Sequence, residues 1–354
     1  MKLSVMVISH NQAHLIRRCL DSILAQKIDA PWEIVISDDA STDDTWAVIQ
    51  EYVTKYPESK KSGENYVPMV RAYQINSSDY NPTVTSDRCA ANKANVYMHT
   101  EGDYCVNIDA DDYLKSDDIY AYQMSQLEPH PECSVAVQNI WYQNDGESIE
   151  LGHAWHYRGA WKENEIIGFE EYCKRRLFTS NPAFMMRRDK ELKPMEKYGL
   201  LFDDPIISAH HILRGKIICS ERADYVYVQY PKSIWNDISS CDRTLRQITP
   251  TVVYLKFFPK YKRAILDMGA MELIRSLKSY LNLKDISCSE ETLAYVKRMQ
   301  CKLLLQMAEG GNKCKMQIKV LLNTILVRNV MQRDAVSLVT DGVIVNLLRC
   351  YDYQ

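Results

Sequence analysis

The feature that most constrains the fold is a unit that recurs in the first part of the chain: a short apolar run, a polar turn, and a segment with helical spacing of apolar side chains. The apolar runs, rich in Val and Ile, cover residues 3–9, 33–37, 67–74, 104–108 and 134–139. Runs of this length and composition are typical of buried strands. Their alternation with helices predicts an α/β fold with a mostly parallel sheet flanked by helices.

Helical patterns follow the polar turns. Apolar side chains recur at helical spacing over residues 15–24, and Asn11 is the expected N-cap of that helix. A second helix is expected to run from Thr42, as its cap, to about Val53, and a further helix covers residues 116–127. Strands and helices therefore alternate as a sheet covered on both faces requires.

The character of the chain changes beyond about residue 237, where the strand patterns stop. Helical apolar periodicity, with Lys and Arg on the opposite face, covers residues 263–281, 290–307 and 315–327. The sequence therefore predicts an α/β domain over residues 1–236 and a smaller helical region over residues 237–354. Solvation explains the basic faces of these helices, and so does contact with an anionic membrane surface.

Composition excludes several classes of protein. The 43 basic and 46 acidic residues give a net charge of -3, without the basic excess expected of a nucleic-acid binder. The 11 cysteines are scattered and contain no Cys-x-x-Cys pair, which indicates free thiols in a reducing compartment. No apolar run reaches the roughly 18 residues of a membrane span, and the N-terminal run is too short for a signal peptide. We therefore expect a cytoplasmic protein, with peripheral contact to the inner face of the cell membrane as an open alternative.

Two acidic clusters follow predicted buried strands. Asp38 and Asp39 come directly after the strand at residues 33–37, where a carboxylate can accept a hydrogen bond from the N–H of a nucleotide base. Turn and helix-cap chemistry is the alternative for this pair, because Asp is favoured in both settings. In open α/β sheets, ligands bind beyond the carboxyl ends of the strands. Both clusters are therefore expected to face the same crevice.

The second cluster is Asp109, Asp111 and Asp112, after the strand at residues 104–108. Three carboxylates so close together repel one another, so either some of them bind protons or a cation neutralises them. Oxygen ligands select hard cations such as Mg2+ or Mn2+. Such an ion can stabilise the charge of a departing diphosphate.

A third acidic pair, Asp203 and Asp204, begins a helical pattern that continues through His210. Asp at the start of a helix is stabilised by the helix dipole, which is one interpretation of the pair. The other interpretation makes Asp204 a general base that takes the proton from an attacking hydroxyl.

Together these segments resemble glycosyltransferase family 2, which has the GT-A fold. Residues 3–11, LSVMVISHN, look like the family's first strand and the turn that meets the nucleotide. Residues 34–45, IVISDDASTDDT, are similar to its second strand and DDxSxDxT turn. Residues 91–94 and 101–104 look like its RNxG and AxGxY segments, which precede the metal-binding strand.

The resemblance continues in the acidic segments. Residues 109–114, DADDYL, look like the family's DxDD metal motif, and residues 201–215 resemble the ED…RxxG helix that carries the base. The match covers roughly residues 3–230, and the order and spacing of the motifs make it specific. Asp203 stands where the family usually has Glu, and Ala91 stands where it has Arg.

The resemblance implies a nucleotide site. Asp39 would bind uracil or another base, with Asp38 beside it, while Ser9 and Asn11 would line the pocket. Arg88 lies close in sequence to the segment that resembles the RNxG motif and could contact the phosphates.

It also implies a metal site and a base. Asp109 and Asp111 would hold Mn2+ or Mg2+ against the diphosphate, so Asp109 belongs to the nucleotide site as well, and Asp111 is the favoured direct ligand. Asp204 would be the catalytic base. Many relatives complete the metal site with a His, which residues 228–235 lack.

Four further residues are candidate contacts to substrate or phosphate. They are Asp112, Asp203, His210 and Lys232.

The implied activity is inverting transfer of a single sugar from a nucleotide-diphosphate sugar, expected to be a UDP-sugar, to a hydroxyl group. The acceptor would be a saccharide or lipid-linked saccharide in the synthesis of a bacterial capsule, O-antigen or exopolysaccharide. The QxxRW motif of processive synthases is absent, which favours single transfer.

The sequence leaves two alternatives open. A sugar nucleotidyltransferase would also use acidic residues and a metal, but residues 9–18 hold no glycine for the Gly-rich loop that grips a triphosphate. A non-catalytic binding protein for nucleotide sugars would have lost the metal or base carboxylates, whereas Asp109, Asp111 and Asp204 are all present.

Overall fold

The structure is a computed structural model in which the chain splits into two compact units. Unit 1 comprises Met1–Tyr172 and Leu177–Ser233, and unit 2 comprises Cys173–Arg176 and Ile234–Gln354. The structure describes residues 1–80, 85–144, 149–152, 161–175, 183–230, 254 and 257–265. Of the helices expected beyond residue 237, only residues 263–265 fall within this described part.

The centre of unit 1 is a 10-stranded sheet in the order β10-β12-β8-β11-β6-β1-β2-β5, with β7 paired to β12 and β9 paired to β8. Its strands are β1 Leu3–Ser9, β2 Trp32–Asp39, β5 Met69–Ile75, β6 Tyr104–Asp109, β7 Tyr113–Leu114, β8 Cys133–Asn144, β9 Ile149–Gly152, β10 Ile166–Ile167, β11 Phe184–Arg187 and β12 Lys216–Gln229. A separate hairpin consists of β3 Lys60–Ser62 and β4 Asn65–Val67.

The sheet is parallel where the sequence predicted it to be and mixed beyond that. Strands β6, β1, β2 and β5 are parallel neighbours, and β8 is parallel to β12. Strand β11 lies between β6 and β8 and is antiparallel to both. Every residue of β1 and β2 is buried, which explains why residues 5–8 and 34–36 are consecutive apolar residues without polar alternation.

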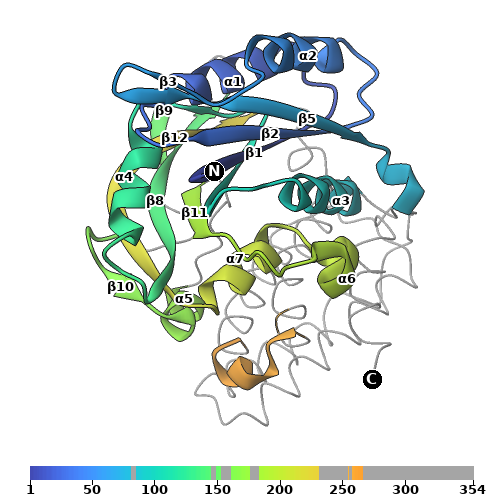
Figure 1. Cartoon of the computed structure of the whole chain (residues 1–354). Helices are drawn as coiled ribbons and strands as arrows, with labels where there is room; N and C mark the ends of the chain where they lie inside the picture. Colours follow the sequence, from blue (N-terminus) through green and yellow to red (C-terminus); the bar gives the residue numbers. More distant parts are fainter. Residues whose placement is uncertain are drawn as a thin grey trace. The chain divides into compact units, whose positions relative to one another are not determined.

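Helices cover both faces of the parallel strands. Figure 1 shows α1 and α2 on one face of β1, β2 and β5, and α3 on the other. The helices are α1 Ile16–Leu24, α2 Thr45–Lys55, α3 Thr85–Met98, α4 Ile119–Leu127, α5 Phe169–Arg175, α6 Pro194–Tyr198 and α7 Asp204–Ile212. In the part of the chain that the structure describes, the 3-10 helices are η1 Ser77–Tyr80, η3 Gly199–Leu201 and η4 Pro259–Tyr261.

The predicted caps of the first two helices are wrong. Helix α1 begins at Ile16 rather than after Asn11, and α2 begins at Thr45 after Asp44. Asn11 adopts a left-handed backbone conformation, with φ 54°, and its side-chain oxygen accepts a hydrogen bond from the backbone N–H of Thr42 at 2.8 Å. These two residues therefore join the turn after β1 to the turn after β2 instead of capping helices.

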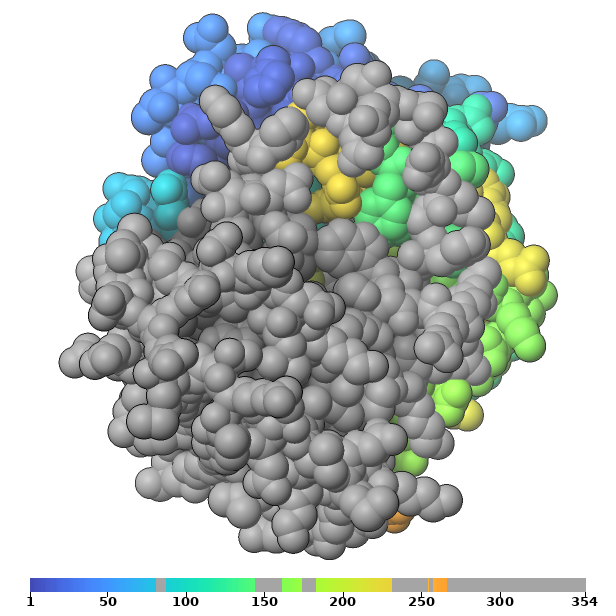
Figure 2. Space-filling model, turned by 180° about the vertical axis from the view of Figure 1, so that it is seen from behind, coloured from blue at the N-terminus to red at the C-terminus, as the bar shows by residue number. Residues whose placement is uncertain are grey.

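The other half of the sheet is built on β8 and β12. They run parallel over almost their whole length, with irregularities in register between Cys219 and Tyr225. Seen from behind, yellow atoms from the C-terminal part of unit 1 lie beside green atoms from its middle, in agreement with this pairing (Figure 2). No helix among the described residues combines the length and the apolarity that a membrane crossing requires.

A buried charge network lies at the end of the parallel strands remote from the acidic clusters. Glu33 is the second residue of β2 and is fully buried; it accepts hydrogen bonds from the Ser4 hydroxyl at 2.6 Å and the Glu101 N–H at 2.7 Å. The guanidinium of Arg71, on β5, forms an ion pair with the same carboxylate. A Cβ atom on Gly102 would lie 2.5 Å from the Ser4 nitrogen, so the close approach here requires glycine.

The six cysteines of the described residues are free thiols. They are Cys19, Cys89, Cys105, Cys133, Cys173 and Cys219.

Candidate functional site

Parallel pairing brings the ends of three strands to one edge of the sheet. Ser9 is in register with Asp38 on β2, and its neighbour Ile8 is in register with Asp109 on β6. The two acidic clusters of the sequence therefore lie on either side of the end of β1. This is the edge at which open α/β sheets bind their ligands.

Asp38 organises the turn that follows β2. Its carboxylate accepts hydrogen bonds from the Ser9 hydroxyl at 3.0 Å, the Ser41 N–H at 3.1 Å and the Gln74 amide at 3.1 Å. The Ser41 hydroxyl donates a further bond at 2.5 Å. Because Asp38 is fully buried and both oxygens are bonded within the protein, its observed contacts shape the turn.

Asp39 is paired with Arg88. The Nη2 atom of Arg88 lies 2.8 Å from Oδ2 of Asp39, and the Nε atom donates to the same oxygen at 3.0 Å. Ser77, at the start of η1, donates to this carboxylate from its N–H at 2.9 Å and from its hydroxyl at 2.8 Å. Arg88 was predicted to serve phosphates, and the structure places its guanidinium on the carboxylate that was predicted to read the base.

His10 is a polar residue of this edge to which the sequence assigned no role. Its Nδ1 lies 2.7 Å from the carbonyl oxygen of Asp39, so Nδ1 carries the proton. Its Nε2 then accepts a bond from the Asn11 amide at 3.3 Å. The backbone N–H of Asn11 donates to the Ser41 hydroxyl at 2.8 Å, so the turns after β1 and β2 form one hydrogen-bonded unit.

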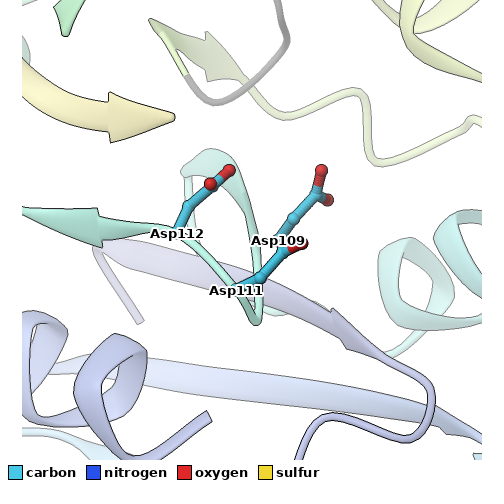
Figure 3. Close-up of side chains that lie close together, drawn as sticks. All are labelled: Asp109, Asp111 and Asp112. Atoms are coloured by element: carbon cyan, nitrogen blue, oxygen red, sulfur yellow. The ribbon is translucent and has the colours of Figure 1, made fainter. Parts of the chain in front are cut away.

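The acidic turn after β6 gathers three carboxylates. One ligand oxygen from each of Asp109, Asp111 and Asp112 lies within 4.8 Å of the others. Figure 3 shows the three side chains leaving the same turn, with the carboxylates of Asp109 and Asp112 directed to the same side. Burial and the neighbouring Asp111 and Asp203 raise the pKa of Asp109 to about 6, although Lys93 opposes the shift. Burial also raises the pKa of Asp111.

Asp112 differs from the other two because it faces strand β12. Its carboxylate accepts a hydrogen bond from the Tyr225 hydroxyl and another from the Val228 N–H at 2.8 Å. Burial, together with Asp111 and Asp109, raises the pKa of this fully buried group well above its usual range. Asp112 therefore fixes the acidic turn to β12 and leaves Asp109 and Asp111 as the more accessible pair.

Arg18 holds the same turn from the side of α1. Its Nη2 donates to the backbone oxygen of Asp111 at 2.9 Å and to the Tyr230 hydroxyl at 3.0 Å. The guanidinium carbon lies 4.5 Å from the centre of the Tyr113 ring, within the range of a cation–π contact. The turn is thus held by side chains from two elements distant in sequence.

The described residues of the turn fit a divalent cation. The donors are all carboxylate oxygens, the ligands that Mg2+ and Mn2+ prefer. Burial is the main cause of the raised pKa values of Asp109 and Asp111, and a bound cation would offset this cost of ionising them. Asp109 and Asp111 would hold such an ion.

The third acidic pair is joined to the site by Lys93 of α3. The Lys93 Nζ lies 2.6 Å from Oδ1 of Asp203 and also bonds Oδ1 of Asp204. Asp204 is the first residue of α7 and its side chain is 32% exposed. Burial raises the pKa of Asp204 to about 6; Lys93 lowers this pKa, whereas Asp203 and Asp109 raise it.

His210, another predicted substrate contact, is engaged within the protein. Its Nε2 lies 2.9 Å from Oδ2 of Asp189, and its Nδ1 lies 2.8 Å from the Tyr198 hydroxyl. The imidazole is 5% exposed. Burial lowers its pKa to about 4 despite the hydrogen bond to Asp189, so it is neutral near pH 7. These contacts join α7 to Asp189 and to Tyr198 at the end of α6. Lys232, the remaining predicted contact, lies outside the described residues.

Sequence patterns left Lys93 without a role because its partners lie far along the chain. Asp203 is 110 residues away, and no local pattern marks that approach. Lys93 falls in the segment that resembles the RNxG motif, and that position was the available signal.

A family model described as glycosyl transferase family 2 matches residues 4–64, which include β1, β2 and the two turns joined by Asn11.

Known sequences add partial matches. An uncharacterised protein of Mycobacterium bovis is 25% identical over 236 residues, which are 66% of this chain and 60% of that protein. This chain therefore spans less than two thirds of that relative's length. The poly(ribitol-phosphate) beta-glucosyltransferase of Bacillus spizizenii is 30% identical over 118 residues, 33% of this chain and 16% of that protein.

Solved structures show the fold. The crystal structure of S. aureus TarS 1-349 has a TM-score of 0.59 and 16% identity, and the alignment covers 99% of this chain and 89% of that one. The same protein in complex with UDP-GlcNAc gives a TM-score of 0.56 with the same identity and coverage. This similarity confirms the predicted α/β fold of the GT-A type, with its large curled sheet flanked by helices.

Proposed function

Because this chain belongs to glycosyltransferase family 2, we propose that it transfers a single sugar from a nucleotide-diphosphate sugar to a hydroxyl group, with inversion at the anomeric carbon. The observation that carries this proposal is the arrangement of carboxylates around the end of β1. Asp39 lies on β2 and Asp109 on β6, the two strands that flank β1. Lys93 of α3 forms an ion pair with Asp204 at the start of α7. This arrangement supports a nucleotide site, a metal site and a base close to one another.

Asp204 would act as the general base. An inverting transfer needs one carboxylate that takes the proton of the acceptor hydroxyl while that oxygen attacks the anomeric carbon. Asp204 is partly exposed at the start of α7, and its pKa of about 6 leaves it ionised but basic near pH 7. The bond from the anomeric carbon to the diphosphate oxygen breaks as the new glycosidic bond forms, and the nucleoside diphosphate leaves.

Asp109 and Asp111 would hold Mn2+ or Mg2+. A divalent ion supplies charge stabilisation for the departing diphosphate when it is bound. Asp112 and Arg18 position the turn, through Tyr225 and the Asp111 carbonyl respectively. We assign Asp112 this supporting role because its two oxygens already accept bonds from β12.

The nucleotide would lie along the turns after β1 and β2. Ser9, Asn11, Asp38, Asp39 and Arg88 form one connected polar network there, which supports their predicted assignment to the nucleotide site. Within it, Asp38 and Asp39 would shape the pocket, while the exposed Asn11 and half-buried Arg88 would meet the base and ribose.

The proposed donor is a UDP-sugar. Support comes from S. aureus TarS, which shares the fold and is described in complex with UDP-GlcNAc. For the acceptor we propose a saccharide or a lipid-linked saccharide, in the synthesis of a bacterial surface polysaccharide. An acceptor of that kind would bring the protein to the inner face of the cell membrane.

Calorimetry tests the donor site. Purified protein is titrated with UDP, GDP, CDP and dTDP and with their sugars, with Mn2+ or with chelator. We expect metal-dependent binding of uridine nucleotides, lost in Asp111→Ala. The matched control is Asp117→Ala, which removes an exposed carboxylate paired with Lys27 and should bind as the wild type does.

Donor turnover separates the enzyme from a binding protein. Slow release of UDP from a UDP-sugar with water as acceptor should depend on Asp204 and vanish in Asp204→Asn, while nucleotide binding persists. Binding without turnover in any acceptor panel would favour a non-catalytic binding protein. Absence of binding to every nucleotide diphosphate by the folded protein would overturn the proposal.

A further inference from the structure

Lys93 is a buried lysine that binds the two carboxylates at the start of α7 and has no role in the chemistry proposed above. It lies on α3, and its side chain is only 6% exposed. Its Nζ donates to one oxygen of Asp203 and one oxygen of Asp204, the two carboxylates at the start of α7. A lysine so deeply buried keeps its charge only where carboxylates compensate for the lost hydration.

The electrostatic setting of Lys93 is consistent with a permanent cation. Burial alone favours the neutral amine, but Asp203, Asp204 and Asp109 outweigh it and raise the pKa of Lys93 well above its usual range. The raised pKa favours the ammonium form of Lys93 at neutral pH. This ammonium is a fixed positive charge between the base-bearing helix and the metal turn.

The backbone around Lys93 is anchored to the nucleotide edge. Its neighbour Asn92 is buried and donates from its amide to the Ser9 carbonyl oxygen at 3.2 Å. Asn95, one position beyond Ala94, donates to the Ser37 hydroxyl at 2.8 Å. Two side-chain amides therefore fix helix α3 to β1 and β2. Through its bonds to Asp203 and Asp204, Lys93 also fixes the start of α7 relative to these strands.

From these contacts we infer that Lys93 is a positioning residue that holds Asp203 and Asp204 in place and keeps Asp204 in the carboxylate form. The inference rests on the proposed role of Asp204 as base. Lys93 does not touch the reacting atoms in this assignment; it acts through the carboxylate that it binds. Asp203 shares the ammonium and serves as the second anchor of the pair.

The groups that face Asp204 show why one cation matters. Asp203 adjoins it on its own segment, Asp109 faces it from β6, and Tyr227 of β12 senses its charge. Those carboxylates disfavour ionisation of Asp204, and burial does too. Within the part of the chain that the structure describes, Lys93 lowers the pKa of Asp204, and the N-terminal end of the α7 dipole also favours the carboxylate.

The test compares Lys93→Met with Lys93→Arg and follows the pH dependence of donor turnover. We expect Lys93→Met to lose about tenfold in turnover at pH 7, because without the ammonium the pKa of Asp204 rises by about two units from its value of about 6, and to regain activity toward pH 9. Lys93→Arg should keep a profile close to the wild type. The control is Lys190→Met, which removes an exposed ammonium paired with Asp103 at 2.9 Å.

A second readout does not depend on catalysis. Protein labelled with carboxyl-13C aspartate is titrated by NMR, and the Asp204 signal is identified by its absence in Asp204→Asn. Its titration midpoint should rise in Lys93→Met, even in the event that the protein turns over no donor. Lys93→Gln provides a second neutral variant should the methionine variant fail to fold, as judged by circular dichroism.

Three results would overturn the inference. The first is an unchanged titration of Asp204 in the neutral variants. The second is a loss of turnover that is equal at all pH values. The third is a weaker Kd for UDP with an unchanged pH profile, which would make Lys93 a phosphate contact instead.

Discussion

The hydroxyl of Tyr225 donates a hydrogen bond to the carboxylate of Asp112, and this contact joins strand β12 to the acidic turn after β6. The two residues are 113 positions apart, and both are fully buried. The Val228 N–H, on the same strand, bonds the other oxygen of Asp112. The half of the sheet that contains β12 therefore fixes the turn that contains Asp109 and Asp111.

Removal of that hydroxyl should loosen the turn. We expect Tyr225→Phe to lower the free energy of unfolding by about 2 kcal/mol, because a buried acidic group loses a hydrogen-bond donor. Urea denaturation measures this change. In the same variant, Mn2+ binding followed by calorimetry should weaken.

Tyr113→Phe is the matched control for this prediction. Its hydroxyl bonds Gln143 at 2.9 Å in a half-buried setting, so its loss should cost less than about 1 kcal/mol. Equal losses in the two variants would contradict a special role for the Tyr225 bond.

Arg71→Met should be among the most damaging substitutions remote from the site. It leaves the fully buried carboxylate of Glu33 without its counter-ion. Breaking one side of a buried ion pair typically lowers the free energy of unfolding by about 3 to 5 kcal/mol. Thermal and urea unfolding measure the loss, and Lys190→Met, at an exposed pair, should change it by less than about 0.5 kcal/mol. A small effect of Arg71→Met would mean that Ser4 and the Glu101 N–H suffice for Glu33.

Stability should fall in acid partly through His210. Its pKa is lowered to about 4 in the folded protein, chiefly by burial, whereas an unfolded chain titrates near the ordinary 6.5. The unfolded state therefore binds more protons between these values, so the contribution of His210 is complete above about pH 6.5 and is lost progressively down to about pH 4. The full effect is about 3 kcal/mol.

Unfolding in urea at a series of pH values checks this window. His210→Gln should flatten the dependence of the free energy of unfolding between pH 6.5 and pH 4, while a variant of the exposed His130 should not. An unaltered pH dependence in His210→Gln would show that other groups account for the acid sensitivity.

Ala40 offers a stabilising substitution beside the nucleotide edge. It has φ 45°, a left-handed conformation that disfavours any residue with a Cβ. Ala40→Gly should raise the free energy of unfolding by up to about 1 kcal/mol, since the relief of strain exceeds the entropy that glycine loses. Ala72→Gly, in the extended strand β5, should have the opposite sign. A destabilising Ala40→Gly would show that the Cβ atom makes a compensating contact.

The parallel strands were predictable because both of their faces are buried. Residues 3–9, 33–37 and 104–108 are continuous apolar runs, and β1, β2 and β6 begin and end within a residue or two of them. Helix α3 was not predicted because part of its buried face is polar. Asp87, Asn92 and Lys93 are buried on it, which interrupts the apolar period.

The site was predictable to the same extent as the strands that carry it. Asp38, Asp39 and Asp109 follow buried strands, so their shared edge follows from parallel pairing. The contacts of Asp112 and Lys93 depend on residues more than 100 positions away, which no local pattern encodes. The roles of the site residues remain predictions that the proposed experiments address.

The place of β11 in the sheet has a consequence for synthesis of the chain. Strand β11 follows β8 in sequence but lies between β6 and β8 in space. Until Phe184–Arg187 has left the ribosome, the nascent chain can pair β6, β1, β2 and β5, but β6 presents an open edge. Completion of the sheet therefore waits for a four-residue strand, and during that interval the growing chain is exposed to pairing with other chains, the stage at which a chaperone would protect it.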